Sequence, residues 1–453
     1  MDAACGGASL IVAAARRYSV RMCVCACTCT SAIRVQRPPW RGLATHQMIS
    51  AEEKRFAGFA DDEELVMPLP VDDDESDDEC VSPRPGDADE PASGGAQMEA
   101  LLERVVDGDT TAAPRLFDAD MWRELAVGTG LHVCEGSAAA AATSTNDATR
   151  LRRSLDERGY LQSEPLAGSS DELDALRRLK LMLDELRVRG FAPAWIYVFD
   201  EAWEVLERCW RLLAEVLAPG EPPDAIVLEP SFFAYALVRP AEAAALEDAA
   251  DAREVVRHTY VGGNFGLPHR DHSSADCFDG ASGAPTMVSL WCPLTPVTAD
   301  NGCMHVVPKE FDPLLTQPDH PLHLLPFDQH SRRANFELSA AVALAPCEPS
   351  CAVAWHGSSI HWGGRCSRYA AAEPRASLTA TLRRRDAPRT QLQRLQRLPE
   401  LSLSTSPSLF STSLPLPLAD RVRYVAANIL LYKYWYGLAQ GVIPPQLVGA
   451  AAE

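Results

Sequence analysis

The sequence predicts an α+β protein in which helices precede and flank an antiparallel β-sandwich or barrel. Residues 98–217 repeat apolar side chains at helical spacing, whereas residues 225–382 contain short β-branched or aromatic runs bounded by Pro or Gly. A helical half followed by a strand-rich half is typical of a β core with helices packed outside it. No internal repeat is visible.

The helices of the first half are predicted from their amphipathic spacing, over residues 98–106, 151–158, 170–189 and 200–217. The third begins with Asp171 and Glu172, and acidic side chains favour the first turn of a helix. A further apolar helix is expected over residues 420–438. Its aromatic ridge either packs against the β core or contacts a second copy of the chain. Residues 401–418, rich in Leu, Ser and Pro, are expected to form a loop.

The strands are predicted from short runs at residues 225–228, 231–238, 286–292, 351–355 and 376–382. Together with the charge pattern described next, they divide the chain into five parts. These are a leader (1–50), an acidic linker (51–96), a helical N-terminal part (97–220), the β core (221–390), and a loop with a C-terminal helix (391–453).

Charge is unevenly distributed along the 453 residues. Residues 1–50 contain six arginines and one acid, and residues 51–95 contain sixteen acids and three bases. The arginine-rich start resembles an organelle transit peptide, or it is a mispredicted leader with Met48 as the true start. The acidic segment cannot bury enough apolar area to offset its conformational entropy. We therefore expect a disordered spacer or an acidic interaction peptide there.

Composition excludes several classes of protein. A net charge of −20 argues against nucleic-acid binding through a basic surface, and no run approaches the eighteen apolar residues of a membrane span. Outside the leader the cysteines are scattered, which is typical of reduced thiols. We expect an intracellular protein, cytoplasmic or, with a transit peptide, mitochondrial or plastid; the oligomeric state is not predicted.

Two segments of the β core carry candidate metal ligands. Alternate residues of an extended stretch point the same way, so His269 and Asp271 can share one metal while Arg270 points elsewhere. A third ligand can come from His361 or His356, which lie five residues apart and therefore on opposite faces of a strand. Two imidazoles and one carboxylate form the facial triad of non-heme Fe(II) oxygenases, which leaves positions open for O2 and a cosubstrate.

A basic residue follows these ligands at the start of the last predicted strand of the core. Arg375 stands in Pro374-Arg-Ala-Ser377. A guanidinium can hold a carboxylate through two hydrogen bonds, which suits the distal carboxylate of 2-oxoglutarate.

These segments resemble the phytanoyl-CoA dioxygenase (PhyH-like) family of Fe(II)/2-oxoglutarate oxygenases over roughly residues 150–385. The resemblance rests on five segments, which are Leu155-Asp-Glu-Arg-Gly-Tyr-Leu161, His269-Arg-Asp271, Val288-Ser-Leu-Trp-Cys-Pro-Leu294, Thr298-Ala-Asp-Asn-Gly-Cys-Met-His-Val-Val-Pro308 and Ala352-Val-Ala-Trp-His-Gly-Ser-Ser-Ile-His361. They are followed by Arg375.

The resemblance implies a double-stranded β-helix (jelly-roll) core with flanking N- and C-terminal helices. It implies that His269, Asp271 and His361 hold Fe(II), that Arg375 binds 2-oxoglutarate, and that Trp291 lies beside this cosubstrate. The implied reaction is hydroxylation of a small organic or acyl substrate by O2, with release of succinate and CO2.

The chain departs from the family pattern in ways that concern the substrate side. Pro308-Lys-Glu-Phe311 replaces the family's Pro-Gly-Ser-His, and Cys366 replaces an asparagine. Arg365 or Arg368 competes with Arg375 for the cosubstrate. Two alternatives therefore stay open, a non-catalytic jelly roll that binds a metal or ligand, and a cupin-like or hydrolytic Zn(II) protein using the same ligands.

Overall fold

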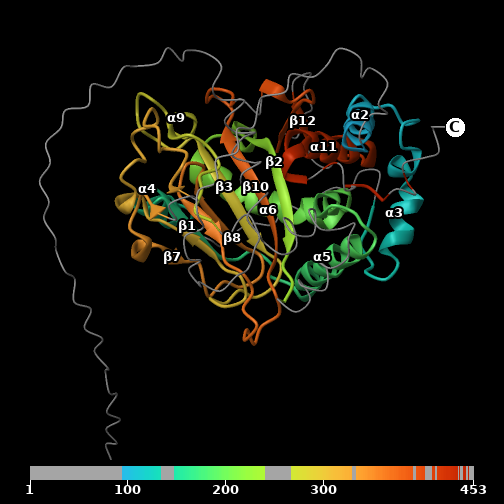
Figure 1. Cartoon of the computed structure of the whole chain (residues 1–453), viewed down its shortest axis with the longest axis horizontal. Helices are drawn as coiled ribbons and strands as arrows, with labels where there is room; N and C mark the ends of the chain where they lie inside the picture. The colour runs from blue at the N-terminus through green and yellow to red at the C-terminus, as the bar shows by residue number, and fades with distance from the viewer. Residues whose placement is uncertain are drawn as a thin grey trace, which may run out of the picture. The chain divides into compact units, whose positions relative to one another are not determined.

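Two mainly antiparallel β-sheets form the centre of the computed structural model, and helices cover one of them (Figure 1). The structure describes residues 94–133, 147–239, 267–328, 333–390, 394–403, 411–413, 416–436, 438, 442–444 and 447. The predicted leader and nearly all of the acidic linker lie outside these residues. The described part begins with α2 (Gly94–Val106), inside the range assigned to the linker.

The larger sheet has seven strands in the order β1-β8-β3-β10-β2-β11-β12. Their bounds are β1 Tyr160–Pro165, β8 Cys351–His356, β3 Met287–Pro293, β10 Ala376–Arg384, β2 Ile226–Ala236, β11 Glu400–Ser402 and β12 Ser411–Ser413. The smaller sheet has the order β7-β4-β9, with β7 Val342–Ala343, β4 Met304–Val306 and β9 His361–Gly363. Strands β5 (Phe327–Asp328) and β6 (Arg333–Ala334) form a separate two-stranded ribbon. All neighbours pair antiparallel except β11 and β12.

The two faces of the larger sheet differ in character because side chains alternate along each strand. In β3, Val288 and Leu290 join the hydrophobic core formed with the helices, whereas Trp291 joins a separate core with residues of the smaller sheet. Ser289 points the same way as Trp291. The inner face of the larger sheet is thus available for a site between the sheets, and the predicted α+β jelly-roll fold is confirmed.

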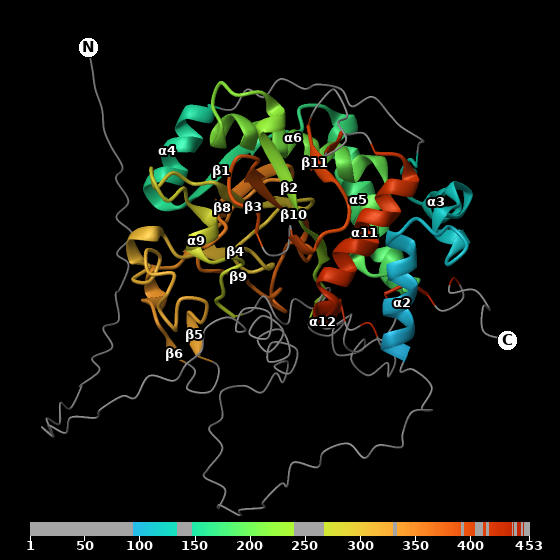
Figure 2. The ribbon, with the colours of Figure 1, turned by 90° about the horizontal axis from the view of Figure 1, so that it is seen from above.

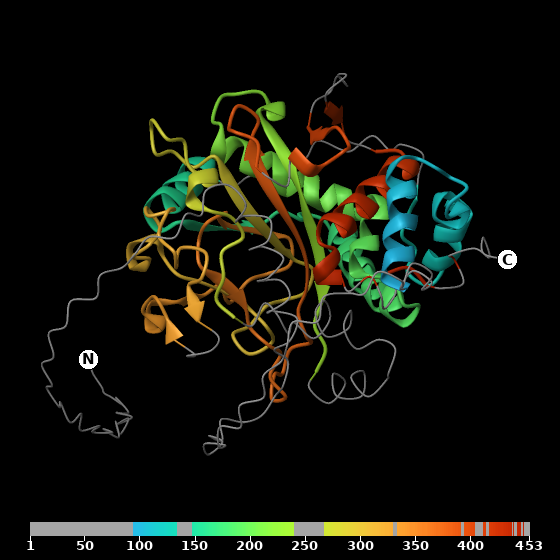
Figure 3. The ribbon, with the colours of Figure 1, turned by 45° about the horizontal axis from the view of Figure 1, so that its top comes forward.

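Helices from both ends of the chain pack around the larger sheet, and the short α9 lies between β2 and β3 in the sequence. Besides α2, the helices are α3 Ala119–Ala126, α4 Ala148–Arg158, α5 Ser170–Val188, α6 Asp200–Leu217, α9 Ser274–Cys277, α11 Leu418–Leu431 and α12 Lys433–Tyr436, with short 3-10 turns between some of them. Helices α5, α6 and α11 contact strands β2, β3 or β10. Ser169 caps α5, since its side chain accepts a hydrogen bond from the Glu172 amide and Glu172 bonds back to Ser169. Figures 2 and 3 show α2 beside α11. No helix in the described part of the chain is long and apolar enough to cross a membrane.

Three expectations from the sequence need correction. The segment after α4 forms β1, an edge strand paired with β8, which the helical periodicity before it did not predict. The expected loop 401–418 contains β12 and most of β11, because β11 pairs with the edge of β2. The expected helix 420–438 is two helices, separated at Tyr432, and α11 packs on β2 and α2.

Candidate metal centre and cosubstrate pocket

The three predicted metal ligands come together at one edge of the sheet pair. His269 and Asp271 lie in the extended stretch before α9, and His361 begins β9. The amide of His269 donates to the carbonyl of His361 (3.1 Å), and the amide of His361 donates to the carbonyl of His269 (3.0 Å). This antiparallel bridge places the two imidazoles side by side, with ring centroids 4.4 Å apart.

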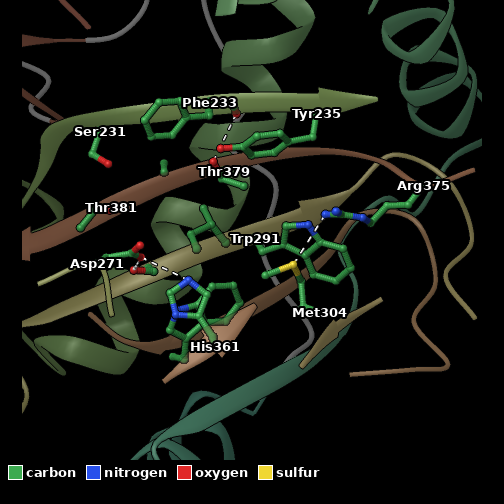
Figure 4. Close-up of a pocket in the computed structure, with 14 residues that line it drawn as sticks. Ser231, Phe233, Tyr235, Asp271, Trp291, Met304, His361, Arg375, Thr379 and Thr381 are labelled. Carbon is green, nitrogen blue, oxygen red and sulfur yellow. Dashed lines mark hydrogen bonds and ion pairs between the residues drawn. The ribbon is translucent and has the colours of Figure 1, made fainter. Parts of the chain in front are cut away.

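The donor atoms of these residues face one small volume. His269 Nε2 is 3.7 Å from Asp271 Oδ1, and His361 Nε2 is 3.6 Å from Asp271 Oδ2. One donor atom from each residue lies within 4.8 Å of the other two. Figure 4 shows Asp271 and His361 turned toward each other at one end of the pocket. Such a cluster can be bridged by a single first-row metal ion.

Hydrogen bonds orient each donor. His269 Nδ1 lies 3.0 Å from the Leu267 carbonyl, and His361 Nδ1 lies 3.0 Å from the Ser359 carbonyl. A carbonyl only accepts, so each Nδ1 carries the proton and each Nε2 presents a lone pair. The Ser289 hydroxyl donates to Asp271 Oδ2 at 2.6 Å. The donor set therefore fits a divalent cation without rearrangement of its tautomers.

Electrostatics keep these donors in their metal-binding form. Burial, aided by the neighbouring His361, lowers the pKa of His269 to about 4. Burial alone would raise the pKa of Asp271, but the adjacent His361 and His269 outweigh it and the pKa is lowered. The Asp271 side chain is 29% exposed, which leaves one side of the cluster open. At neutral pH His269 is therefore a neutral imidazole and Asp271 a carboxylate.

His356, the competing histidine, lies elsewhere. It ends β8, is buried against Phe278 (ring centroids 4.9 Å apart), and its amide donates to the Gly159 carbonyl. It takes no part in the donor cluster. The structure thus places His361 with His269 and Asp271.

Arg270 anchors the stretch that carries two of the ligands. Its guanidinium makes two bonds to the Asp312 carboxylate (2.5 and 2.7 Å), and both side chains are 1% exposed. It also donates to the carbonyls of His323 and Ser358, each at 2.6 Å. Arg270 therefore ties His269 and Asp271 to the loop after β4 and to the turn before His361.

Arg375 lies at the other end of the same pocket. Its guanidinium carbon is 5.6 Å from the Trp291 ring centroid, and its Nη1 contacts Met304 Sδ (3.6 Å) and Ser377 Oγ (3.3 Å). The residue is 2% exposed, and its Nε has no hydrogen-bond partner among the described residues. Burial lowers its pKa to about 10, so it stays a cation at neutral pH. A buried cation with an unused donor suits a carboxylate ligand.

A glycine turn makes room for Arg375. Gly302 has φ +106°, and a Cβ there would lie 2.3 Å from Leu237 Cδ1 and 3.6 Å from Arg375 Nε. The fully buried Asn301 fixes this turn, because its side-chain amide donates to the carbonyls of Pro296 (2.8 Å) and Glu373 (2.9 Å). The Asn301 carbonyl in turn accepts from the Arg375 amide at 3.1 Å.

The departures from the family pattern lie outside the pocket lining. Lys309, in the altered turn after Pro308, donates to the Asp156 carbonyl at the end of α4. Arg368 lies over the Tyr369 ring, 4.7 Å from its centroid. Neither Arg365 nor Arg368 lines the pocket, whereas Arg375 does.

Residues 224–366 match the family model described as phytanoyl-CoA dioxygenase (PhyH). This stretch of the chain is therefore similar to PhyH domains. The matched part contains His269, Asp271, Trp291 and His361 and ends before Arg375.

Solved structures similar to the chain share little sequence with it. A nickel complex of the non-heme monooxygenase ThoJ is 14% identical over 59% of this chain and 89% of that chain, with a TM-score of 0.36. The 2-oxoglutarate-dependent epimerase SnoN from nogalamycin biosynthesis is 17% identical over 60% and 94%, with a TM-score of 0.31. EvdO2 from Micromonospora carbonacea var. aurantiaca is 17% identical over 55% and 97%, with a TM-score of 0.32. No curated protein matches the chain.

The sequence did not single out the residues that line the rest of the pocket. Ser231, Phe233 and Tyr235 line it from β2, and Thr379 and Thr381 line it from β10. The strand run 231–238 could have identified Ser231, Phe233 and Tyr235, because alternate side chains of a strand point to the same face of the sheet.

Proposed function

We propose that this protein is an Fe(II)- and 2-oxoglutarate-dependent dioxygenase that hydroxylates a small organic or acyl substrate and releases succinate and CO2. His269, Asp271 and His361 would hold the iron, and Arg375 would pair with the distal carboxylate of 2-oxoglutarate beside Trp291. Bound iron and 2-oxoglutarate would together supply the activation of O2. Hydroxylation fits this site better than halogenation, because Asp271 fills the position that a chloride ligand would need.

The observation that supports this proposal most is the buried Arg375 in the same pocket as the three metal donors. A hydrolytic zinc site or a structural metal site needs the donors but has no use for a buried guanidinium with an unused Nε. A keto acid that carries a second, distal carboxylate needs both the metal donors and the guanidinium at once. Ser289, Trp291 and Met304 line the same pocket as the metal donors and Arg375.

The chain's own residues prepare the site before any ligand binds. The carbonyls of Leu267 and Ser359 fix the two imidazoles, and Ser289 fixes the Asp271 carboxylate. The Trp291 ring covers the guanidinium of Arg375 and shields it from water. Positioning of this kind is what the protein contributes, while the chemistry belongs to the cofactor.

Succinate formation from 2-oxoglutarate tests the proposal, with Fe(II), ascorbate and O2 present and with a set of candidate substrates. We expect His361→Ala and Asp271→Ala to abolish succinate formation, and His356→Gln to retain it. Arg375→Met should raise the KM for 2-oxoglutarate at least about a hundredfold, the loss expected for a buried charge-assisted pair. Arg368→Met is the matched control and should change this KM less than twofold.

Metal binding without any succinate would contradict the oxygenase assignment and favour a zinc protein or a non-catalytic jelly roll. Equal succinate formation by the parent and Asp271→Ala would also contradict it, because the proposed iron site would then be dispensable.

A further inference from the structure

One side of the pocket is used neither by the metal donors nor by Arg375. Strands β2 and β10 supply this side through Ser231, Phe233, Thr379 and Thr381, and we call these residues the β2–β10 wall. Cross-strand register places Thr379 between Phe233 and Trp291, and Thr381 beside Ser289. In Figure 4 Ser231 and Phe233 lie on the opposite side of the view from His361, and Thr381 lies beside Asp271. A substrate held there would face the proposed iron.

The wall carries no charge. Among the described residues that line the pocket, the carboxylate is Asp271 and the guanidinium is Arg375, and both have assigned roles. Ser231 and Thr381 are at most 8% exposed, and their hydroxyls make no hydrogen bond with the described part of the chain. The Thr379 hydroxyl is already used, since it donates to the Phe233 carbonyl at 3.4 Å. Two neutral hydroxyls are therefore available to a ligand.

Phe233 gives the wall its apolar surface, and the C-terminal helices hold its ring. The ring packs edge-on against Tyr432 (centroids 4.7 Å apart, planes at 74°) and stacks with Tyr436 (6.2 Å, 28°). The Asn428 side chain fixes α11 to this part of β2 by accepting a hydrogen bond from the Phe232 amide at 3.2 Å. These helices lie outside the matched residues 224–366.

We propose that the β2–β10 wall selects an uncharged substrate with an aromatic or other apolar body and a neutral oxygen or amide group. The body would lie against Phe233, and the neutral polar group would bond with Ser231 or Thr381. This inference rests on the proposed function, because it assumes that Arg375 and the metal donors are occupied.

The physical reason is the cost of burying an unpaired charge. A carboxylate or ammonium group placed against the wall would lose its water and find only neutral hydroxyls in return. The desolvation of a neutral polar group costs far less free energy, and one hydrogen bond to a wall hydroxyl offsets that cost. An apolar body gains free energy from contact with the Phe233 ring.

The test uses the full chain loaded with Mn(II) and N-oxalylglycine, which occupy the two assigned ends without turnover. N-oxalylglycine should raise the melting temperature only with Mn(II) present, and this rise should vanish in Arg375→Met. Failure at this step overturns the proposed function, and the substrate inference falls with it. The same thermal measurement, repeated on each later variant, shows that the variant is folded.

The loaded protein is then mixed with size-matched aryl compounds that differ in one group: amides, ketones and alcohols against carboxylates and ammonium salts. We expect neutral compounds to bind at least about ten times more tightly than their charged counterparts, measured as Kd. Equal or tighter binding of a charged series, or binding of no series, overturns the substrate inference while leaving the proposed function intact.

Variants of the wall locate the binding. Phe233→Ala should raise the Kd of a neutral ligand about tenfold or more, and Phe233→Leu should raise it less. The Kd of N-oxalylglycine should stay within twofold in both. Phe311→Ala, at an exposed phenylalanine on the turn after β4, is the control and should leave both constants unchanged. Unchanged neutral-ligand binding in Phe233→Ala overturns the placement.

Discussion

Loss of Asp312 should destabilise both the fold and the metal centre, although Asp312 touches none of the proposed ligands. Asp312→Ala removes the carboxylate that pairs with Arg270 and leaves a guanidinium that is 1% exposed with two carbonyl acceptors. Breaking a buried ion pair on one side costs about 3–5 kcal/mol. At roughly 2 °C per kcal/mol for a chain of this size, the melting temperature should fall by about 6–10 °C.

The same change should weaken metal binding. Arg270 lies between His269 and Asp271 and ties both to the turn before His361, so its release loosens two of the three ligands. Loss of a partner that orients metal ligands typically lowers affinity 10–100-fold. Mn(II) titration of the metal-free protein and thermal unfolding followed by circular dichroism measure the two effects.

A surface ion pair serves as the control for Asp312→Ala. Glu185 pairs with Arg189 along α5, and the two side chains are 34% and 58% exposed. Glu185→Ala should cost about 0.3–0.5 kcal/mol and leave Mn(II) affinity unchanged. If Asp312→Ala melts within about 2 °C of the parent and binds Mn(II) equally well, the argument that Arg270 anchors the ligand stretch is wrong.

Three further predictions follow from single contacts. Gly302→Ala should lower the melting temperature and weaken 2-oxoglutarate binding, because its Cβ would overlap Leu237 and its φ is left-handed; an unchanged Kd for N-oxalylglycine would contradict this. Ser289→Ala should weaken Mn(II) binding about tenfold by freeing the Asp271 carboxylate, and an unaltered titration would count against that hydrogen bond. Burial, with a contribution from Lys309, lowers the pKa of His356 to about 4, whereas the unfolded chain titrates near 6.5. The unfolded state then binds more protons between these values, so the free energy of unfolding falls as the pH drops from about 6.5 to 4. His356→Gln should flatten this dependence in melting curves between pH 7 and 4.5, and parallel curves would refute it.

Much of the candidate site was predictable because it depends on short-range patterns. His269 and Asp271 share a side because alternate residues of an extended chain do so, and the same rule turns Arg270 away. The strand runs around Trp291 and Arg375 were recognisable from their β-branched and aromatic residues. Each of these features is fixed by neighbours within a few residues along the chain.

Other parts of the site depend on contacts between distant segments. Residue spacing left His356 and His361 as alternatives and the family resemblance implied His361; the backbone bridge from His269 to His361 brings this histidine to the donor cluster. The Asp312 carboxylate lies 42 residues from Arg270, and the Tyr432 ring lies far from Phe233 in sequence. No local spacing predicts such pairs.

The sequence by itself determined the α+β class, a helical half followed by a strand-rich half, and His269, Asp271 and Arg375 as candidate residues of the metal and cosubstrate ends. The tertiary structure decided which histidine joins the cluster, which strand forms the sheet edge at β1, and which neutral wall faces the metal donors. The physical reason is that periodicity is set by backbone geometry within one segment. Burial and pairing instead depend on which segments the whole chain brings into contact.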